Sequence, residues 1–124
     1  MILVVDDNAS NQYVARVVLE KFGLQAHLVD NGQEAIRAAS SDQYELILMD
    51  CRMPVCDGYE ATEAIRAIQA RTGKRVPIIG VTACAMEGDR EKCLAAGMDD
   101  YVTKPLTLDA FKGLLIRWLS SMPR

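Results

Sequence analysis

The sequence has few of the residues that build zinc sites. Its 124 residues include a single histidine, His27, and four cysteines, no two of which form a C-x-x-C pair. The cysteines are Cys51, Cys56, Cys84 and Cys93. With so few nitrogen and sulfur ligands at metal-binding spacing, we do not expect a zinc site. A chain of this length can build a hydrophobic core without disulfides, so scattered cysteines indicate a cytosolic protein with free thiols.

Long apolar runs and an excess of basic residues are also missing. No run approaches the roughly 18 apolar residues of a membrane span. The apolar segment 1–5 has no basic residues before it and runs into two aspartates, so it does not resemble a signal peptide. A net charge of -3 argues against a nucleic-acid-binding surface. We therefore expect one domain that makes no direct contact with a membrane or a nucleic acid.

Short β-branched runs alternate with longer amphipathic segments along the whole chain. Strands are predicted at 2–5, 25–29, 46–49, 76–81 and 101–102, and helices at 8–22, through 35–39, and at 58–69, 86–96 and 108–119. The strands show little polar alternation, which is typical of strands buried on both faces. The pattern predicts a single α/β domain with a parallel, doubly wound sheet between two layers of helices.

Unusual polar residues follow four of the five predicted strands. Asp6 and Asp7 follow the first strand, Asp50 the third, Thr82 the fourth and Lys104 the fifth. In doubly wound sheets, ligands bind at the carboxyl ends of the strands. Three carboxylates gathered there would repel one another, and a hard divalent cation would offset that repulsion. Oxygen ligands favour Mg²⁺, or Mn²⁺ in its place, with Asp7 and Asp50 as direct ligands and Asp6 bound directly or through water.

The remaining strand-end residues complete a phosphate site. The Lys104 ammonium is a point charge for a phosphoryl oxygen, and the Thr82 hydroxyl can donate a hydrogen bond to another. Asp50 is the candidate nucleophile, a carboxylate that can form an acyl phosphate by in-line attack. The small residue Ala83 would leave the phosphoryl pocket open. These residues predict acceptance of a phosphoryl group.

Several motifs together resemble the response-regulator receiver family of two-component phosphorelay systems. They are V-V-D-D-N, M-D-C-R-M-P-V-C-D-G-Y-E-A-T, V-T-A, A-A-G-M-D-D-Y and K-P-L, and the resemblance is greatest to receivers of hybrid sensor histidine kinases. It covers the whole chain and implies a flavodoxin-like (βα)5 three-layer sandwich with strand order 2-1-3-4-5. Residues 1–124 are expected to be one receiver domain. Chain ends this close to the fold suggest a domain cut from a longer hybrid kinase or regulator, and a free-standing receiver is the alternative. Such a domain is expected in the cytoplasm, or in the cytoplasmic part of a membrane-anchored sensor kinase.

The resemblance also implies a role for each site residue. By this resemblance, Asp50 is the phosphoacceptor. Asp6 and Asp7 are the metal-binding pair, and the backbone carbonyl of Arg52 is a further metal ligand. Thr82 and Tyr101 are the switch residues, and Lys104 precedes a cis peptide bond to Pro105. The implied phosphodonor is a histidine kinase or a histidine-phosphotransfer domain. The domain is expected not to turn over substrates, and any kinase activity would belong to other parts of a parent chain. Cys84 stands where such receivers often carry Asn, which leaves the lifetime of the phosphoryl group open.

Phosphorylation is expected to change a surface formed by the helix 86–96, the strand 101–102 and the last helix. The helix 86–96 has a poor apolar face and contains Gly88, as expected of a weakly held element.

Gly58 is expected to serve backbone geometry and Trp118 to lie in the core. Asp99 and Asp100 are expected to form a turn.

Three other functions fit the sequence less well. A haloacid-dehalogenase-like phosphatase has its nucleophile after the first strand and an acid two residues later, where this chain has Asn8. A flavodoxin-like cofactor binder would need a glycine- and hydroxyl-rich phosphate loop after the first strand, where the acids here would repel a flavin phosphate. A pseudo-receiver would have lost phosphorylation, and the intact set of acids, Thr82 and Lys104 argues against that loss.

Overall fold

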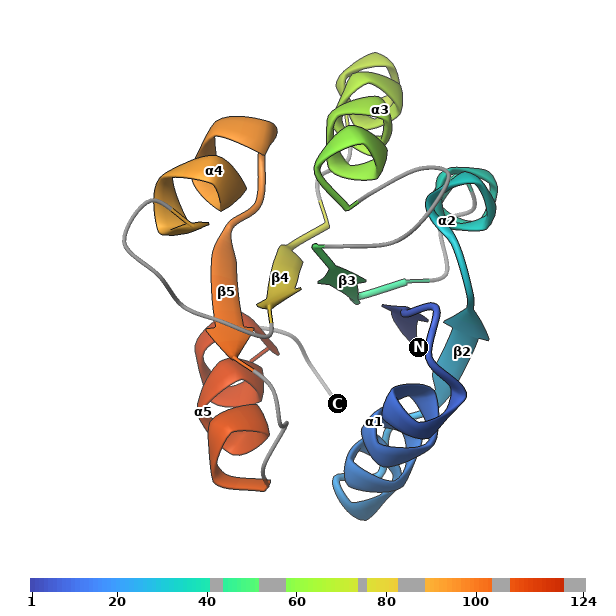
Figure 1. Cartoon of the computed structure of the whole chain (residues 1–124), viewed down its shortest axis with the longest axis vertical. Helices are drawn as coiled ribbons and strands as arrows, with labels where there is room; N and C mark the ends of the chain where they lie inside the picture. Colours follow the sequence, from blue (N-terminus) through green and yellow to red (C-terminus); the bar gives the residue numbers. More distant parts are fainter. Residues whose placement is uncertain (41–43, 52–57, 74–75, 83–88, 104–107, 120–124) are drawn as a thin grey trace.

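A five-stranded parallel sheet forms the middle layer of the protein (Figure 1). The computed structural model describes residues 1–40, 44–51, 58–73, 76–82, 89–103 and 108–119. The strands are β1 (Ile2–Val5), β2 (Ala26–Val29), β3 (Leu46–Asp50), β4 (Ile78–Thr82) and β5 (Asp100–Thr103). The helices are α1 (Ala9–Lys21), α2 (Gly32–Ala39), α3 (Gly58–Thr72), α4 (Asp89–Ala96) and α5 (Leu108–Leu119). The strand order, β2-β1-β3-β4-β5, is the expected one.

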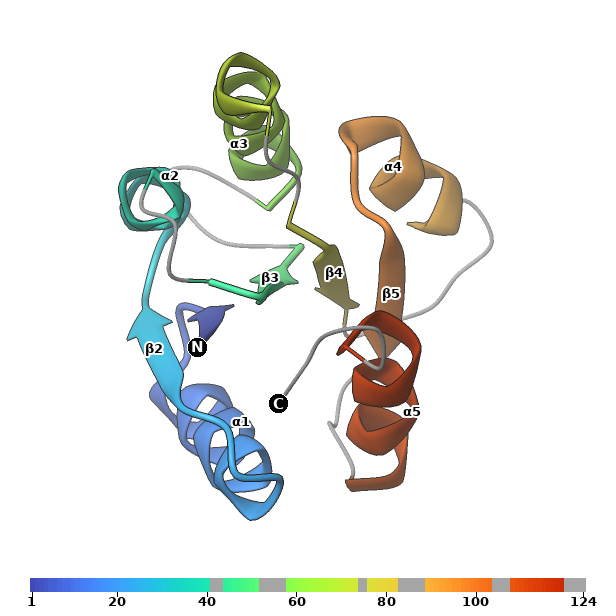
Figure 2. The same ribbon diagram turned by 180° about the vertical axis from the view of Figure 1, so that it is seen from behind.

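Helices cover both faces of the sheet, with α1 and α5 on one face and α2, α3 and α4 on the other (Figure 1; Figure 2, from behind). Each face has its own apolar core. Ile2 and Val4 of β1 pack into the core under α1 and α5, whereas Leu3 and Val5 pack into the core under the other three helices. Every residue of β1, β3 and β4 is buried, which explains why these strands lack polar alternation.

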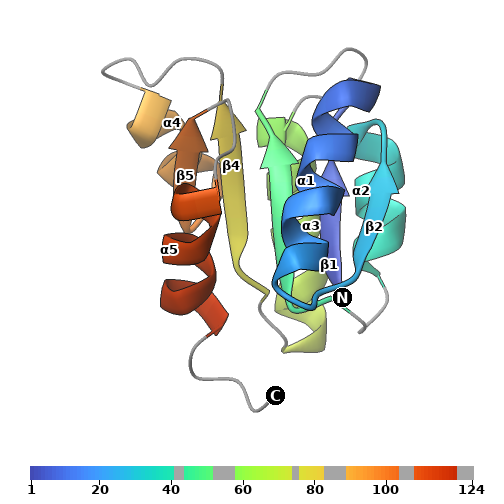
Figure 3. The ribbon, with the colours of Figure 1, turned by 90° about the horizontal axis from the view of Figure 1, so that it is seen from below.

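The register of the sheet brings the carboxyl ends of three strands together. Val5 pairs with Met49, the residue before Asp50, and Asp50 pairs with Val81, the residue before Thr82. The strands run in one direction, so these ends share one edge of the sheet (Figure 3). The residues that follow β1 and those that end β3 and β4 therefore lie side by side.

Polar residues set the starts of the first two helices. The Asn8 side chain accepts a hydrogen bond from the Asn11 backbone N–H at 3.1 Å, so α1 begins one residue later than expected. Asn31 caps α2 by accepting from the Glu34 N–H at 2.8 Å. Helix α1 ends at Lys21, and Gly23 takes the positive φ of 76° that stops a helix. These caps use the short polar side chains favoured at helix starts.

The expectation that Asp99 and Asp100 form a turn before β5 is wrong for Asp100, whereas Asp99 lies in a bend just before the strand. Asp100 is the first residue of β5 and pairs with Ile79. The Asp99 carboxylate accepts hydrogen bonds from the Ile78 N–H at 2.9 Å and from Arg66 Nη2 at 2.5 Å. The strand begins earlier than its apolar residues suggested because Asp100 pairs with β4, while the Asp99 side chain joins the preceding bend to β4 and α3.

Trp118 has a polar contact as well as a core position. It is half-buried and packs against the core under α1 and α5, as expected. Its indole Nε1 also donates to the Asp100 carboxylate at 3.3 Å, next to Arg117, which donates to the same oxygen at 2.8 Å. This end of α5 is therefore held to β5 by polar contacts in addition to apolar packing.

Helix α4 has a small buried face. Its described range begins at Asp89, and the first expected residues, including Gly88, lie outside the described part of the chain. Among the α4 residues with described exposure, Cys93 and Ala96 are buried, and Leu94 is 48% exposed. Few apolar contacts hold this helix, which is consistent with a mobile element.

Candidate functional site

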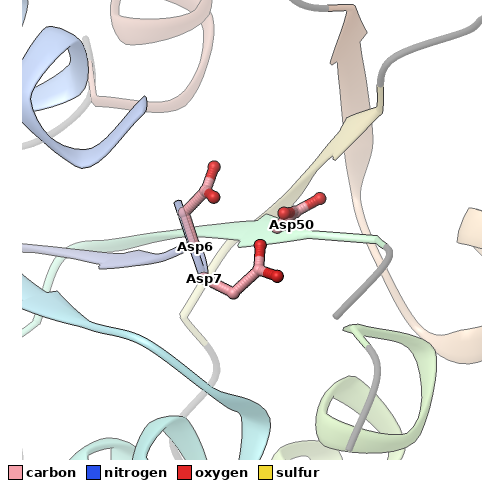
Figure 4. Close-up of side chains that lie close together, drawn as sticks. All are labelled: Asp6, Asp7 and Asp50. Carbon is pink, nitrogen blue, oxygen red and sulfur yellow. The ribbon is translucent and has the colours of Figure 1, made fainter. Parts of the chain in front are cut away.

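Three carboxylates meet at the carboxyl edge of the sheet (Figure 4). Asp6 and Asp7 follow β1 and Asp50 ends β3, and each offers an oxygen within 4.8 Å of the others. Asp6 and Asp50 are buried, with 5% and 4% of their surfaces exposed, whereas Asp7 is exposed. The site is therefore a mostly buried acidic cluster that opens to solvent on the side of Asp7.

The loop after β1 holds Asp6 in place through its own backbone. The Asn8 N–H donates to Asp6 Oδ1 at 2.9 Å. Gln12 Nε2 donates to the Asp6 carbonyl at 2.7 Å and to the Val29 carbonyl at 3.2 Å, so it joins the ends of β1 and β2. The sequence reasoning missed Gln12. Its signal was a polar residue three positions before the buried Ala15 on the inward face of α1.

The cluster fits a hard divalent cation. Three carboxylates this close repel one another, and a bound cation would offset that repulsion. All the donors are oxygens, which suit Mg²⁺ and not the nitrogen and sulfur sites of zinc. Asp6, Asp7 and Asp50 are the residues that would hold the ion. Arg52, whose carbonyl was expected as a further ligand, lies outside the described residues.

Thr82 and Tyr101 lie on the two strands beyond Asp50. Thr82 ends β4 with 6% of its surface exposed, one residue past the partner of Asp50. Tyr101 pairs with Gly80 and packs, half-buried, against the core under α2, α3 and α4. The structure thus places both residues on the side of Asp50 away from β1. The other expected phosphate-site residues, Ala83, Lys104 and Pro105 with its cis bond, lie outside the described residues, as does Cys84.

The first residue of α3 packs directly on the backbone of the acidic cluster. The Gly58 N–H donates to the Cys51 carbonyl at 3.2 Å. A Cβ atom at Gly58 would lie 2.1 Å from the Asp50 carbonyl oxygen, which is inside any van der Waals contact. The role expected for Gly58 was backbone geometry, and the physical requirement is a close approach of two backbones.

Cys51, the residue after Asp50, has a strongly perturbed thiol. Its pKa is raised from the ordinary value of 9.0 to about 12, chiefly by burial, with smaller contributions from the neighbouring Cys93 and the charge of Asp50. A hydrogen bond from Tyr59 opposes these effects. The thiol is therefore protonated at neutral pH and is not a reactive nucleophile.

Known proteins resemble this chain along nearly its whole length. The family model described as response regulator receiver domain matches residues 2–115. Hybrid signal transduction histidine kinase G of Dictyostelium discoideum is 44% identical over 119 residues, which are 94% of this chain and 3% of that protein. The chain thus spans a small part of that kinase.

Solved structures give the same family. The receiver domain of sensor histidine kinase PA1611 from Pseudomonas aeruginosa PAO1, with magnesium coordinated in its active-site cleft, is 49% identical, with a TM-score of 0.86 over 97% of each chain. A second match comes from the co-crystal structure of the Saccharomyces cerevisiae phosphotransfer protein Ypd1 with the receiver domain of Ssk1. It is 35% identical, with a TM-score of 0.88 over 94% of this chain and 86% of that one.

The described helices include none that is long and apolar enough to cross a bilayer.

The α/β architecture, the strand order and the acidic cluster agree with the family match over residues 2–115. The chain belongs to the response regulator receiver domain family of two-component phosphorelay systems.

Proposed function

We propose that this receiver domain is a signalling switch in which Asp50 accepts a phosphoryl group from a phosphohistidine donor. The observation that carries the proposal is the place of Asp50, buried at the end of a central strand with ligand oxygens of Asp6 and Asp7 within 4.8 Å. A carboxylate needs no general base to act as a nucleophile. The domain's own work is to position the reacting oxygen and to supply the ligands of the metal.

The proposed transfer is a single in-line displacement. One Asp50 oxygen forms a bond to phosphorus while the bond from phosphorus to the donor imidazole breaks. The electron pair returns to the imidazole, which is protonated on its other nitrogen. Bound Mg²⁺ would neutralise charge on the phosphoryl oxygens. Asp7, the exposed member of the cluster, lies on the side from which a donor can approach.

Thr82, Lys104 and Tyr101 are proposed to read the product. The Thr82 hydroxyl at the end of β4 would donate to one phosphoryl oxygen and Lys104 would pair with another. Movement of Thr82 would let Tyr101 turn inward and change the surface of α4, β5 and α5. A full population reversal needs about 5.5 kcal/mol, and charge-assisted hydrogen bonds of about 1.5–3 kcal/mol each could supply most of it.

The proposed phosphodonor is a histidine kinase or a histidine-phosphotransfer protein. Support comes from the Ssk1 receiver, which was crystallised with the phosphotransfer protein Ypd1, and from the hybrid kinases that contain similar domains. We propose that this domain does not turn over substrates and that any kinase activity resides in other parts of a parent protein.

Intact-mass spectrometry tests the proposal. The domain is incubated with Mg²⁺ and a small phosphodonor such as phosphoramidate, beside an Asp50→Asn variant. The expected result is one phosphoryl adduct on the unmodified domain, removed by hydroxylamine as an acyl phosphate is, and none on Asp50→Asn. Asp109→Asn is a matched control, because Asp109 is an exposed acid in the first turn of α5.

The possible outcomes separate the rival functions. An adduct that persists in Asp50→Asn would place the phosphoryl group elsewhere and contradict the proposal. Continuous hydrolysis of phosphate esters would favour a phosphatase. Absence of any adduct under conditions where Mg²⁺ binds would favour a pseudo-receiver.

A further inference from the structure

Three sulfur atoms converge on the backbone of Gly80 in β4. A Cβ atom built on Gly80 would lie 2.6 Å from Met98 Sδ and 3.2 Å from the Sγ atoms of both Cys51 and Cys93. The sulfurs come from three places in the chain: the residue after β3, α4, and the segment before β5. The missing side chain of Gly80 therefore leaves room for a sulfur cluster between the sheet and α4.

The spacing of the two thiols suits a bridging ion. Cys51 Sγ and Cys93 Sγ lie 3.8 Å apart, and both are thiols in the structure. A disulfide would need them at about 2.05 Å. An ion with metal–sulfur bonds of about 2.3 Å would span the observed separation at a sulfur–metal–sulfur angle of about 110°, a normal coordination angle. Bridging by an ion therefore needs no closure of the gap between the thiols.

The surroundings select a soft ion. Cys51, Cys93 and Met98 are 1%, 0% and 3% exposed and belong to the apolar core under α2, α3 and α4. Thiolates suit both Cu(I) and Zn²⁺, but the thioether of Met98 is not among the usual zinc donors and favours Cu(I), whereas Mg²⁺ prefers oxygen. In the part of the chain that the structure describes, the acidic group able to hold an ion is the Asp6, Asp7 and Asp50 cluster, which offers only oxygens. The two donor sets are therefore suited to different metals.

We propose that Cys51, Cys93 and Met98 form a binding site for one soft monovalent metal ion, Cu(I). Binding releases the two thiol protons to solvent and transfers no electrons, so Cu(I) stays Cu(I). The site is distinct from the phosphoryl site and does not depend on the proposed function. Because Cys51 follows Asp50 directly, a bound ion would tie α4 to the phosphoacceptor strand.

Access to the buried sulfurs is through α4. Among α4 residues with described exposure, only Cys93 and Ala96 are buried, so opening of this helix breaks few apolar contacts and exposes Cys93. A neighbouring cation–π contact also joins the helix to α3, with Lys92 Nζ 5.9 Å from the centre of the Tyr59 ring. Ion binding would add direct coordination to these weak contacts.

Competitive titration with Cu(I) under anaerobic conditions tests the site. The background protein carries Cys56→Ser and Cys84→Ser, so that Cys51 and Cys93 are its only thiols. Cu(I) is supplied as its coloured bicinchoninate complex, and the metal-free fold of every variant is checked by circular dichroism. The background protein is expected to withdraw one equivalent of Cu(I), and X-ray absorption is expected to show three sulfur ligands.

Two further variants assign the ligands. Cys93→Ala is expected to abolish the withdrawal of Cu(I). Met98→Leu keeps the side-chain volume and is expected to weaken binding about tenfold or more, since even outer-shell losses cost 10–100-fold, and to leave two sulfur ligands. Met49→Leu is the matched control, because Met49 is equally buried in the same core but is not among the sulfurs nearest Gly80. It is expected to bind as the background does.

Three outcomes would overturn the site. The first is a background protein that withdraws no Cu(I) from bicinchoninate, which would leave the sulfurs as core packing. The second is equal affinity in Cys93→Ala and the background. The third is a mass loss of two hydrogens in the background protein on Cu(II) treatment with no metal retained, which would show a disulfide in place of a metal site.

Discussion

The Cα of Gly58 lies against the carbonyl oxygen of Asp50, so close that a Cβ atom there would be 2.1 Å from the oxygen. The start of α3 is thereby packed on the backbone of the proposed phosphoacceptor. The Gly58 N–H also donates to the Cys51 carbonyl at 3.2 Å. Any side chain at this position must displace either the helix or the end of β3.

Gly58→Ala is expected to destabilise the domain and to slow phosphorylation. The added methyl group overpacks the contact, which costs about 1–3 kcal/mol of unfolding free energy, and shifts Asp50 from its position. Urea unfolding and the initial rate of adduct formation measure the two effects. Gly113→Ala is the matched control, because a Cβ atom there meets nothing within 4 Å and alanine favours the α5 helix. Equal stability of the two variants would show that the contact at Gly58 relaxes without cost.

Removal of one acid from the Asp6, Asp7 and Asp50 cluster is expected to separate metal binding from stability. Asp7→Asn relieves repulsion, but Asp7 is exposed, so without metal its unfolding free energy is expected to rise by less than about 1 kcal/mol. Saturating Mg²⁺ is expected to stabilise the unmodified domain far more than this variant. Thermal unfolding with EDTA and with Mg²⁺ gives both quantities. The same Mg²⁺ effect in both proteins would contradict the assignment of Asp7 as a ligand.

Arg66→Lys is expected to loosen the junction of α3, β4 and β5. The Arg66 guanidinium donates to the Gly97 carbonyl and the Val76 carbonyl, each at 2.8 Å, and to Asp99 at 2.5 Å. Lysine cannot make three divergent contacts from one plane, so we expect a loss of about 2–4 kcal/mol in unfolding free energy.

The matched control for Arg66→Lys is Arg37→Lys. The Arg37 side chain is 78% exposed and pairs with Glu34 at 3.4 Å. Exposed pairs of this kind contribute less than about 1 kcal/mol, so a small change is expected in chemical denaturation. Equal losses in both variants would mean that the buried network adds nothing beyond a surface pair.

Stability is expected to fall above pH 9 because of Cys51. Its folded-state pKa of about 12 lies above the ordinary value of 9.0, so between these values the unfolded chain loses a proton that the folded domain keeps. The unfolding free energy should therefore be independent of this group below pH 9 and fall by up to about 1.4 kcal/mol per pH unit above it.

Urea unfolding between pH 8 and pH 10.5, in the presence of a reductant, tests this dependence. Other groups titrate in the same range, so the measurement compares the unmodified domain with Cys51→Ala. From pH 9 to pH 10 the unmodified domain is expected to lose about 1 kcal/mol more than the variant. Parallel pH profiles would show that Cys51 ionises as easily in the folded domain as in the unfolded chain.

Much of the fold was predictable because its signals are local. Continuous apolar runs at β1, β3 and β4 identify strands that are buried on both faces. A polar residue such as Asp50 then marks the point where the strand ends. The extent of β5 was not predictable in this way. Asp100 has no strand propensity of its own and joins the strand through pairing with Ile79 and contacts with α5.

The sequence alone determined which polar residues follow the strands, because the hydrophobic pattern of each segment shows where its strand ends. It also determined that these residues meet, because the carboxyl ends of parallel strands lie at one edge of the sheet. Only the tertiary structure decided the contacts between distant segments. Gln12 joins the ends of β1 and β2, Gly58 touches Asp50, and three sulfurs meet at Gly80. Such contacts depend on how helices pack on the sheet to within an ångström, and no local pattern along the chain encodes that distance.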